Sequence, residues 1–248
     1  MLEIITVTKN DKDGFIKTIN STRFLRENFN ISHIIVDGSD KGIRNEIKTM
    51  SRNEKNILYY WQNPIGISAA FNYGLKFVKS KWIWFLNGGD VINQNIDLNN
   101  FLNILNNSTA DAIIFQIQYM QSGEILNHPP LWSLWPPILS WIPHPATVVK
   151  MDLFKKYGNF DKSLKIAMDY ELWLRFFINN VIVDLISIPI VNFDQNGLAF
   201  ALNYKTKAEV RHILRKYFWQ ILKKWFWQLR IIAKAFIINS LFFRNKIK

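Results

Sequence analysis

The residues best suited to chemistry gather in a short run that ends at residue 90. The apolar segment Trp82–Leu86 stops abruptly at Asn87, Gly88, Gly89 and Asp90. Such a turn opens the end of a buried strand and presents one carboxylate there. In an open α/β sheet, ligands bind beyond the carboxyl ends of the strands, so a carboxylate in this place can hold a metal ion attached to a phosphate. Because Asn-Gly-Gly-Asp is also ordinary turn chemistry, the motif needs support from the rest of the chain.

Composition favours one large α/β domain with an appendage. The chain has 248 residues, 49% of them hydrophobic, and no cysteine. A sizeable core is therefore expected, while a disulfide framework, a thiolate metal site and a cysteine nucleophile are excluded. The segment Met1–Thr8 lacks the basic-then-apolar pattern of a signal peptide and is typical of a first strand. These features favour a cytoplasmic location.

The net charge of +12 is unevenly distributed. Residues 205–248 hold 12 Lys and Arg and one acid, Glu209, whereas residues 1–204 hold 19 Lys and Arg and 18 acids. The body is therefore almost neutral at +1 and the tail carries +11. This asymmetry is typical of an interaction segment attached to a globular domain, and it predicts a boundary between residues 204 and 205.

The first 90 residues alternate between two hydrophobic periods. Apolar runs predict strands over Ile4–Val7, Ile31–Val36, Ile57–Trp61 and Trp82–Leu86. Helical spacing predicts helices over Gly14–Phe29, Gly42–Arg52 and Ile65–Val78. This alternation predicts βαβ units and a parallel sheet. No Gly-x-Gly-x-x-Gly or Walker loop follows the first strand, which argues against a dinucleotide-binding fold and a P-loop kinase.

The pattern is looser after residue 90. It predicts a helix over Leu98–Leu105, a strand over Ala112–Tyr119, and helices over Asp152–Tyr157 and Ile166–Phe177. In the last helix Asp169 and Glu171 lie about 200° apart, so they cannot both face one site. Glu171 can form a surface ion pair with Arg175 one turn later. Asp169 is left without a local partner, which makes it the stronger candidate for chemistry.

One long stretch, 125–149, contains no Lys, Arg, Asp or Glu. Its six prolines forbid a continuous helix, and irregular backbone is not tolerated in hydrocarbon, so it is not a membrane span. The stretch is instead an apolar loop containing Trp132, Leu134, Trp135 and Trp141. Two interpretations remain open: internal packing, and a lid or surface that faces a lipid-linked substrate.

Six ordered pieces of the sequence together resemble glycosyltransferase family 2, over about residues 1–195. The pieces are Ile5–Asn10, Ile34–Asp40, Gly66–Gly74, Phe85–Asp90, His144–Thr147, and Gly158–Asp161 followed by Ala167–Leu172. The chain is most similar to bacterial enzymes that build O-antigen, capsule or exopolysaccharide units. The resemblance implies an inverting enzyme with a GT-A fold, a Rossmann-like and mostly parallel central sheet flanked by helices. Residues 1–90 would form its nucleotide-binding half and residues 91–204 its acceptor half.

The resemblance implies roles for residues at the strand ends. Thr8 and Asp37 match the positions that bind the base and ribose of a nucleotide-sugar. A turn cap is the alternative for Asp37, and a strand-end β-former is the alternative for Thr8. Asp90 matches the last carboxylate of the family's DxD motif, which holds a Mn²⁺ or Mg²⁺ ion against the diphosphate. Three asparagines are also expected in the donor site: Asn10, Asn72 and Asn87.

Asp169 matches the family's catalytic base, which takes the proton of the acceptor hydroxyl as that oxygen attacks the sugar. An exposed aspartate on a helix surface is the alternative. His144 is a candidate for the acceptor or metal side of the site, or else a packed loop residue.

The sequence departs from the family pattern at three places in the expected site. The first carboxylate of DxD is absent, with Asn87 or Gly88 in its place. Residues 62–68 read Gln-Asn-Pro-Ile-Gly-Ile-Ser, where close relatives often carry charges. His144 precedes Pro145 where a glutamine is common. These departures concern the metal geometry and the identity of the donor sugar.

The basic tail predicts a long amphipathic helix over residues 206–235. One side carries Val210, Ile213, Leu214, Tyr217, Ile221 and Trp225, with basic residues over much of the remainder. Phe218, Trp219, Phe226 and Trp227 add aromatic rings that suit a bilayer interface. The longest charge-free stretch of the tail has only nine residues, too few to span a bilayer. A helix lying on an anionic inner leaflet is favoured, and a helix packed on its own catalytic domain is the alternative.

The leading hypothesis is an enzyme on the cytoplasmic face of the plasma membrane. It would transfer a sugar, hexosyl or N-acetylhexosaminyl, from a UDP-linked donor to a polyprenyl diphosphate-linked saccharide. One rival is a degenerate homologue that binds a nucleotide-sugar without turnover, because the DxD motif is incomplete. The other is a nucleic-acid-binding protein, because the tail is basic and aromatic. The neutral body and the apolar face of the tail argue against nucleic acid as a partner.

Overall fold

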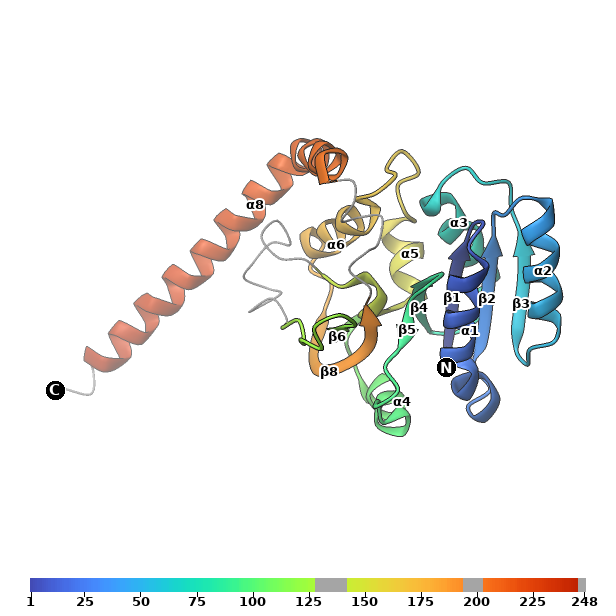
Figure 1. The fold of residues 1–248 in the computed structure, drawn as a ribbon. Coiled ribbons are helices and arrows are strands. Elements are labelled where there is room, and N and C mark those ends of the chain that lie inside the picture. Colours follow the sequence, from blue (N-terminus) through green and yellow to red (C-terminus); the bar gives the residue numbers. More distant parts are fainter. Residues whose placement is uncertain (128–141, 194–202, 245–248) are drawn as a thin grey trace.

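A mixed sheet of eight strands, in the order β3-β2-β1-β4-β7-β6-β8-β5, organises the described part of the chain (Figure 1). The computed structural model describes residues 1–127, 142–193 and 203–244. The strands are β1 Leu2–Thr8, β2 Ser32–Asp37, β3 Ile57–Trp61, β4 Trp82–Asn87, β5 Val91–Ile92, β6 Ala112–Tyr119, β7 Thr147–Lys150 and β8 Val183–Phe193. The helices are α1 Lys12–Asn28, α2 Lys41–Arg52, α3 Ile67–Gly74, α4 Leu98–Asn107, α5 Met151–Tyr157, α6 Met168–Ile178 and α8 Asn203–Arg244, with short 3₁₀ turns at Leu75–Phe77 and His144–Ala146.

The first half of the sheet is parallel, as the alternating periods predict. Strands β3, β2, β1 and β4 lie side by side and run in one direction, joined by α1, α2 and α3. Strand β7 then inserts antiparallel between β4 and β6, and β6 pairs parallel with β8. The predicted helix over residues 65–78 is shorter than expected, because Gly66 has φ +121° and α3 gives way to a 3₁₀ turn at Leu75. The predicted α/β class, with a mostly parallel central sheet flanked by helices, is confirmed.

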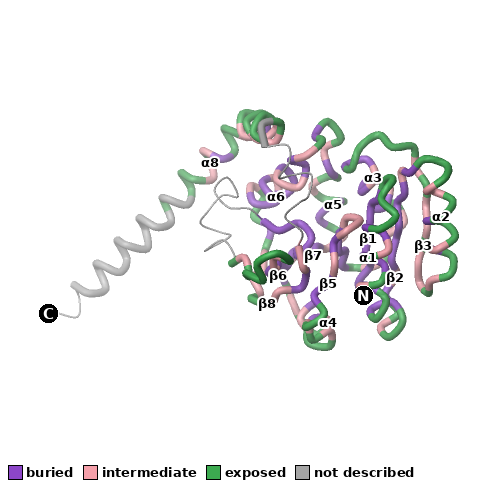
Figure 2. Tube along the Cα trace, in the orientation of Figure 1, coloured by how far each residue is buried: buried purple, intermediate pink, exposed green. Residues whose placement is uncertain are grey.

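Helices cover both faces of the sheet, and the strands between them are largely buried (Figure 2). On one face α1, α2 and α4 pack through residues such as Phe15, Ile47 and Phe101. On the other face α3, α5 and α6 pack through Phe71, Phe154 and Leu172, among others. Alternate residues of each strand point to opposite faces, so β1 places Ile4 in the first core and Ile5 in the second.

Helix α8 has one end on the body and one end away from it. Ile213 and Ile221 are buried in the same core as α6, while the C-terminal part of α8 projects away from the sheet (Figure 1). The tail therefore packs on its own domain along its first turns, as the alternative interpretation predicted. Within the residues that the structure describes, no helix has the length and apolar character needed to cross a bilayer. Residues 128–141 of the predicted apolar loop, with Trp132, Leu134, Trp135 and Trp141, lie outside the described residues. The end of the same stretch is not a loop, because it forms the 3₁₀ turn His144–Ala146 and strand β7.

Candidate active site

The carboxyl ends of β2, β1 and β4 form one edge where the predicted donor residues meet. Thr8 lies opposite Asp37 in the register, and Val7 lies opposite Asn87. The ladder continues past the strands, since Gly38 N–H donates to the Thr8 carbonyl at 2.9 Å and Gly88 N–H donates to the Val7 carbonyl at 3.0 Å. Strand order reverses between β1 and β4, which is where open α/β sheets bind ligands. Of the predicted donor residues, all but Asn72 lie at this edge.

The loop after β1 is tied to the loop after β2. Asn10 has φ +53° and its backbone N–H donates to Ser39 Oγ at 2.8 Å. Its side-chain amide donates to Asp40 at 2.8 Å and its amide oxygen accepts from Asp40 N–H at 2.9 Å. A left-handed conformation is tolerated by asparagine better than by most residues. Asn10 therefore fixes the two loops relative to each other at the mouth of the site.

Asp37 is fully buried at the end of β2. One carboxylate oxygen accepts from the Ser39 N–H at 2.8 Å and the other accepts from the Tyr59 hydroxyl at 2.7 Å. Burial raises the pKa of Tyr59, and the hydrogen bond to the Asp37 carboxylate raises it further. Asp37 therefore does cap the turn after β2, through the Ser39 N–H, and it also binds Tyr59 of β3.

The Asn-Gly-Gly-Asp turn is held by a residue of α1. Thr18 Oγ1 donates to the Asp90 carbonyl at 2.8 Å and accepts from the Gly89 N–H at 3.0 Å. Gly89 has φ +103°, a conformation that side chains disfavour. At Gly88 a Cβ would lie only 3.2 Å from Thr8 Oγ1. The positive φ at residue 89 therefore favours glycine, and a side chain at residue 88 would require Thr8 to move by a few tenths of an ångström.

Asp90 is an almost buried carboxylate at this edge, 9% exposed. Its Oδ2 accepts from the Asn87 N–H at 2.7 Å. Burial raises the pKa of Asp90 to about 6, and hydrogen bonds from Asn87 only partly oppose the shift. A nearby cation would favour the charged form of this carboxylate.

The residues present fit a divalent ion that shares its ligands with a diphosphate. In the described ranges no three His, Asp or Glu side chains group closely enough to hold a metal by themselves. Mg²⁺ is commonly bound through one or two carboxylates together with substrate phosphates and water. Asp90 can supply that one carboxylate, so the ion would depend on the donor for further ligands.

Asp169 lies in the first turn of α6, a helix that packs in the same core as α3. It is partly buried, and its carboxylate accepts the Tyr170 N–H at 2.7 Å. Burial raises the pKa of Asp169 to about 6, with backbone hydrogen bonds acting in the opposite direction. Asp169 is therefore not an exposed surface residue, and it is ionised but poorly solvated at neutral pH.

Glu171 departs from the sequence expectation in one respect. The pairing with Arg175 is confirmed, with contacts of 2.7 and 3.1 Å. The expectation that this pair lies on the surface is wrong, because Glu171 is 1% exposed. Tyr217 of α8 covers it and donates a hydrogen bond to the same carboxylate. The burial depends on a segment 46 residues later in the chain.

Asn72 and His144 both contact segments that pack against or lead into α6. The Asn72 amide exchanges hydrogen bonds of 2.9 and 3.0 Å with the backbone of Phe160, so it holds the loop before α6. His144 is stacked near Phe85 and is 5.7 Å from the Trp173 ring. Burial lowers the pKa of His144 to about 4, so the ring is neutral.

Several polar atoms next to α6 have no hydrogen-bond partner in the described structure. Both ring nitrogens of His144, Trp173 Nε1 and the Tyr170 hydroxyl are buried and unpaired. Buried polar groups are nearly always paired, so these atoms are candidates to meet a substrate or water. They come from the same helix as Asp169 or lie against it.

Sequence reasoning missed Thr18 and Tyr59 as residues that shape the site. A signal for Thr18 was available, since it is a hydroxyl on the buried face of α1 next to Ile19. Tyr59 resembles any aromatic strand residue. It pairs with Ile35 in the register, and only the hydrogen bond of its hydroxyl shows that it reaches Asp37.

Comparison with known proteins agrees with this geometry. The family model for glycosyl transferase family 2 matches residues 3–178, which contain every predicted site residue. The chain belongs to this family. An uncharacterized glycosyltransferase of Rickettsia typhi is 29% identical over 160 residues, covering 59% of this chain and 49% of the relative. One from Mycobacterium tuberculosis is 26% identical over 183 residues, covering 70% and 68%. The chain thus spans about half the length of the rickettsial relative.

Solved structures share the fold. Residues 1–349 of Staphylococcus aureus TarS in complex with UDP-GlcNAc superpose with a TM-score of 0.70 over 89% of this chain and 66% of that chain. The same TarS fragment in complex with UDP gives a TM-score of 0.62. Sequence identity is 17% in both cases, so the likeness establishes the fold alone.

Proposed function

We propose that this chain transfers a sugar from a UDP-linked donor to a lipid-linked saccharide, with inversion, in the synthesis of a bacterial surface polysaccharide. The observation that carries the proposal is the meeting of Thr8, Asp37 and Asp90 at the strand-order reversal of a family 2 domain. The binding of UDP-GlcNAc by the structurally similar TarS supports a UDP-linked donor.

The donor would lie along the edge formed by β2, β1 and β4. Asp37 and Thr8 would meet the base and ribose, with Asn10 ordering the two loops around them. Asn87 and Asp90 would meet the diphosphate. Asp90 would hold Mn²⁺ or Mg²⁺, which when bound supplies positive charge to the departing diphosphate. Asn72 would contribute by holding the Phe160 loop in place.

Asp169 would serve as the base on the acceptor side. A pKa of about 6 leaves it ionised at neutral pH and still basic enough to accept a proton. The acceptor hydroxyl would give its proton to Asp169 as its oxygen bonds to the anomeric carbon and the bond to UDP breaks. The unpaired atoms of His144, Tyr170 and Trp173 would hydrogen-bond hydroxyls of the acceptor.

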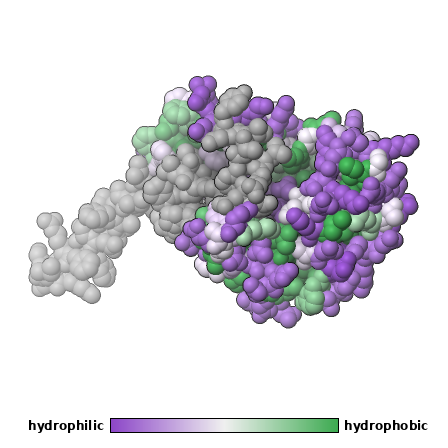
Figure 3. Space-filling view, in the orientation of Figure 1, coloured by the Kyte–Doolittle hydropathy of each residue, from purple (hydrophilic) through white to green (hydrophobic). Residues whose placement is uncertain are grey.

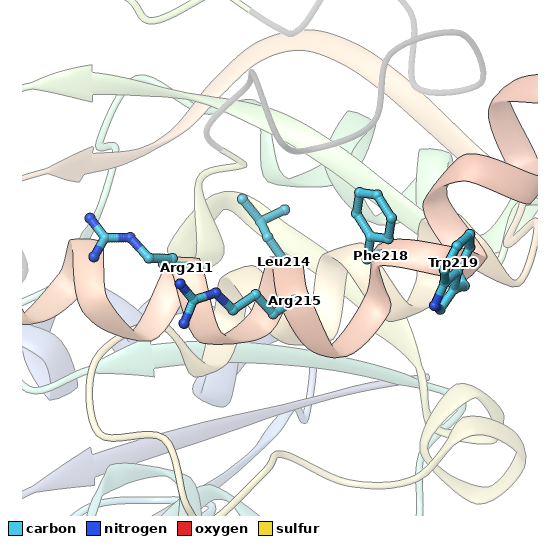
Figure 4. Close-up of a pocket in the computed structure, with 5 residues that line it drawn as sticks. All are labelled: Arg211, Leu214, Arg215, Phe218 and Trp219. Atoms are coloured by element: carbon cyan, nitrogen blue, oxygen red, sulfur yellow. The ribbon is translucent and has the colours of Figure 1, made fainter.

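Helix α8 supports a membrane-bound acceptor. In the view of Figure 3 the described body surface is mainly hydrophilic, with hydrophobic residues in small groups. Exposed aromatic residues instead gather on α8, between 40 and 76% exposed: Phe218, Trp219, Trp225, Phe226 and Trp227. An open hollow of about 350 Å³ on α8 is lined by Arg211, Leu214, Arg215, Phe218 and Trp219 (Figure 4). Basic and aromatic residues in this arrangement suit an anionic bilayer surface, where each Lys or Arg contributes about 1 kcal/mol.

The donor proposal is tested by measuring binding of UDP, UDP-GlcNAc and UDP-glucose with and without Mn²⁺. We expect UDP compounds to raise the melting temperature in the presence of Mn²⁺, because a ligand of the native state stabilises it by mass action. Absence of any shift with all three compounds at millimolar concentration would contradict the proposal.

The competing proposal is binding of a nucleotide-sugar without turnover. It is favoured by the single carboxylate of the Asn87–Asp90 turn. Slow hydrolysis of UDP-GlcNAc, with water as the acceptor, separates the two proposals. Binding accompanied by hydrolysis that Asp169→Asn abolishes supports the enzyme, and binding without hydrolysis or transfer to any acceptor supports the degenerate homologue.

A further inference from the structure

The backbone that leads into the first turn of α6, which carries Asp169, is bound by a residue from another helix. The N-cap residue of α6 is Ala167, whose methyl side chain cannot accept a hydrogen bond. A helix start leaves backbone N–H groups unsatisfied, and Ser, Thr, Asp or Asn normally fills this need. Glu209 of α8 accepts one of these groups, the Ala167 N–H, together with the two N–H groups that precede it in the chain. This three-bond contact is named the Glu209 cap.

Glu209 binds three consecutive backbone N–H groups with its two carboxylate oxygens. Oε1 accepts from Lys165 at 3.0 Å, and Oε2 accepts from Ile166 at 3.0 Å and from Ala167 at 2.8 Å. Partial burial by itself would raise the pKa of Glu209, but these hydrogen bonds outweigh it and the pKa is lowered. A negative charge at this point also interacts favourably with the dipole of α6.

The residues that Glu209 holds lie directly before Asp169. Ala167 precedes it by two positions, and the Ala167 carbonyl accepts the Glu171 N–H at 3.1 Å within α6. From the opposite side Ser68 of α3 donates to the Leu164 carbonyl at 2.9 Å. The backbone leading to Asp169 is thus fixed between α3 and α8.

A second set of contacts keeps α8 in place beneath this cap. Two turns after Glu209, Tyr217 donates to the Glu171 carboxylate, and Ile213 between them is fully buried. Lys216 pairs with Asp161 at 3.0 Å. Glu209 is also the single acid among the 44 residues of the basic tail. The Glu209 cap therefore belongs to a part of α8 that is held against the body by these contacts.

We infer that Glu209 is a positioning residue for transfer, which acts through the backbone of residues 165–167 to set the place and solvation of Asp169. The inference rests on the proposed role of Asp169 as the base. It makes the tail helix part of the active-site scaffold.

The test uses the full chain and compares Glu209→Ala with Ile213→Val. The control shortens a buried side chain of α8 and leaves the cap intact. NMR titration of the Asp169 carboxyl group is the first readout, and it needs no substrate. We expect Glu209→Ala to lower the pKa of Asp169 from about 6 toward 4, because the start of α6 opens to water, and to speed amide exchange at residues 165–167.

Hydrolysis of UDP-GlcNAc per folded molecule is the second readout. We expect a loss of about 10- to 100-fold in Glu209→Ala, the scale of misplacing a catalytic group by about 1 Å, with UDP affinity unchanged. Glu209→Gln, which keeps an acceptor oxygen, should be intermediate, and Ile213→Val should match the wild type. An unchanged Asp169 pKa in Glu209→Ala, or an equal loss of hydrolysis in Ile213→Val, would overturn the inference.

Asp169→Asn measured in parallel keeps the two proposals distinguishable. If Asp169→Asn hydrolyses UDP-GlcNAc at the wild-type rate, the base assignment fails, whatever Glu209 does. If Asp169→Asn is inactive and Glu209→Ala behaves as the wild type in both readouts, only the positioning role fails.

Discussion

Thr18 and Asp90 are joined across 72 residues by a 2.8 Å hydrogen bond from the Thr18 hydroxyl to the Asp90 main-chain carbonyl. The same hydroxyl accepts from the Gly89 N–H, so one side chain of α1 satisfies both sides of the turn. The position of the proposed metal-binding carboxylate thus depends on a neutral hydroxyl that no charge pattern reveals.

Thr18→Val should weaken UDP binding in Mn²⁺ by about tenfold, equivalent to 1.4 kcal/mol. It leaves the buried Asp90 carbonyl unpaired, whereas the Gly89 N–H keeps the Gly14 carbonyl as an acceptor at 3.0 Å. The unpaired carbonyl should also cost about 1–3 kcal/mol of unfolding free energy. Isothermal titration with UDP and urea denaturation measure the two effects. Thr22→Val is the matched control, since Thr22 is a buried threonine of α1 that bonds to His33 away from the turn. Equal losses of UDP affinity in both variants would contradict the role of Thr18.

Asp90→Asn should remove the Mn²⁺ dependence of UDP binding. The asparagine keeps an oxygen to accept the Asn87 N–H, so the turn is preserved while the charge is lost. We expect Mn²⁺ to strengthen UDP binding by about tenfold or more in the wild type and by less than about twofold in the variant. Asp152→Asn is the control, because it removes the exposed carboxylate of Asp152. A variant that retains the wild-type response to Mn²⁺ would refute the assignment.

Asp169→Asn and Glu171→Gln should have opposite profiles. With saturating donor, we expect Asp169→Asn to lower turnover by about 10²–10⁴-fold while UDP binding is retained. Because Glu171 is buried and paired, Glu171→Gln should cost about 3 kcal/mol of unfolding free energy rather than the few tenths of an exposed pair. Denaturation and initial-rate measurements on both variants check this. Near-normal turnover in Asp169→Asn would exclude it as the base.

Stability should depend on pH through Asp169. Its folded pKa of about 6 lies above the ordinary value of 3.8, so the folded state holds the proton more tightly between these values. The contribution of Asp169 to stability therefore falls as pH rises from about 4 to about 6. Asp169→Asn should leave the melting temperature unchanged near pH 4 and raise it at pH 7.5. The gain is at most about 3 kcal/mol for two pKa units, and less because the side chain is partly exposed. A variant that is less stable than the wild type at pH 7.5 would show that this burial is not costly.

The exposed face of α8 should bind anionic vesicles. We expect the double variant Trp219→Ser, Phe226→Ser to reduce flotation with vesicles containing anionic lipid by about tenfold and to keep the fold, because both rings are more than half exposed. Phe24→Ser on α1 removes a similarly exposed ring and should have no effect. The membrane proposal would be contradicted if the wild type did not float with anionic vesicles, or if it floated equally well with neutral vesicles.

Local patterns predicted much of the framework, because its elements follow simple periods. Strands β3 and β6 have the predicted bounds, and α2 begins within one residue of its prediction. Strand β8 was not predicted: it contains Pro189 and pairs with β6 through an irregular register, so its pattern is not a clean alternation. The donor residues at the strand ends could be predicted as a group, since parallel strands end on one edge.

The environment of α6 could not be predicted from its own residues. Glu171 has an ordinary i, i+4 spacing to Arg175, and nothing nearby in sequence indicates that Tyr217 will cover it. Likewise nothing near Ala167 in the sequence indicates that its N–H will be bound by Glu209, 42 residues later. Contacts between distant segments decide burial, and burial decides the pKa values on which the proposed chemistry depends.

The two faces of α8 also limit which tails are interchangeable among relatives. Suppose the tail is replaced by another of equal charge and hydrophobicity. The outward face would be kept, but the carboxylate of Glu209 and the hydroxyl of Tyr217 would be lost. Conversely, a graft that kept only those two inward residues and the buried Ile213 would preserve the body with a different outer surface. Replaceable and irreplaceable positions should thus alternate along this helix with a period near 3.6 residues. The inward residues of the tail would therefore be retained together with the body they contact, and the tail could not be exchanged independently of that body.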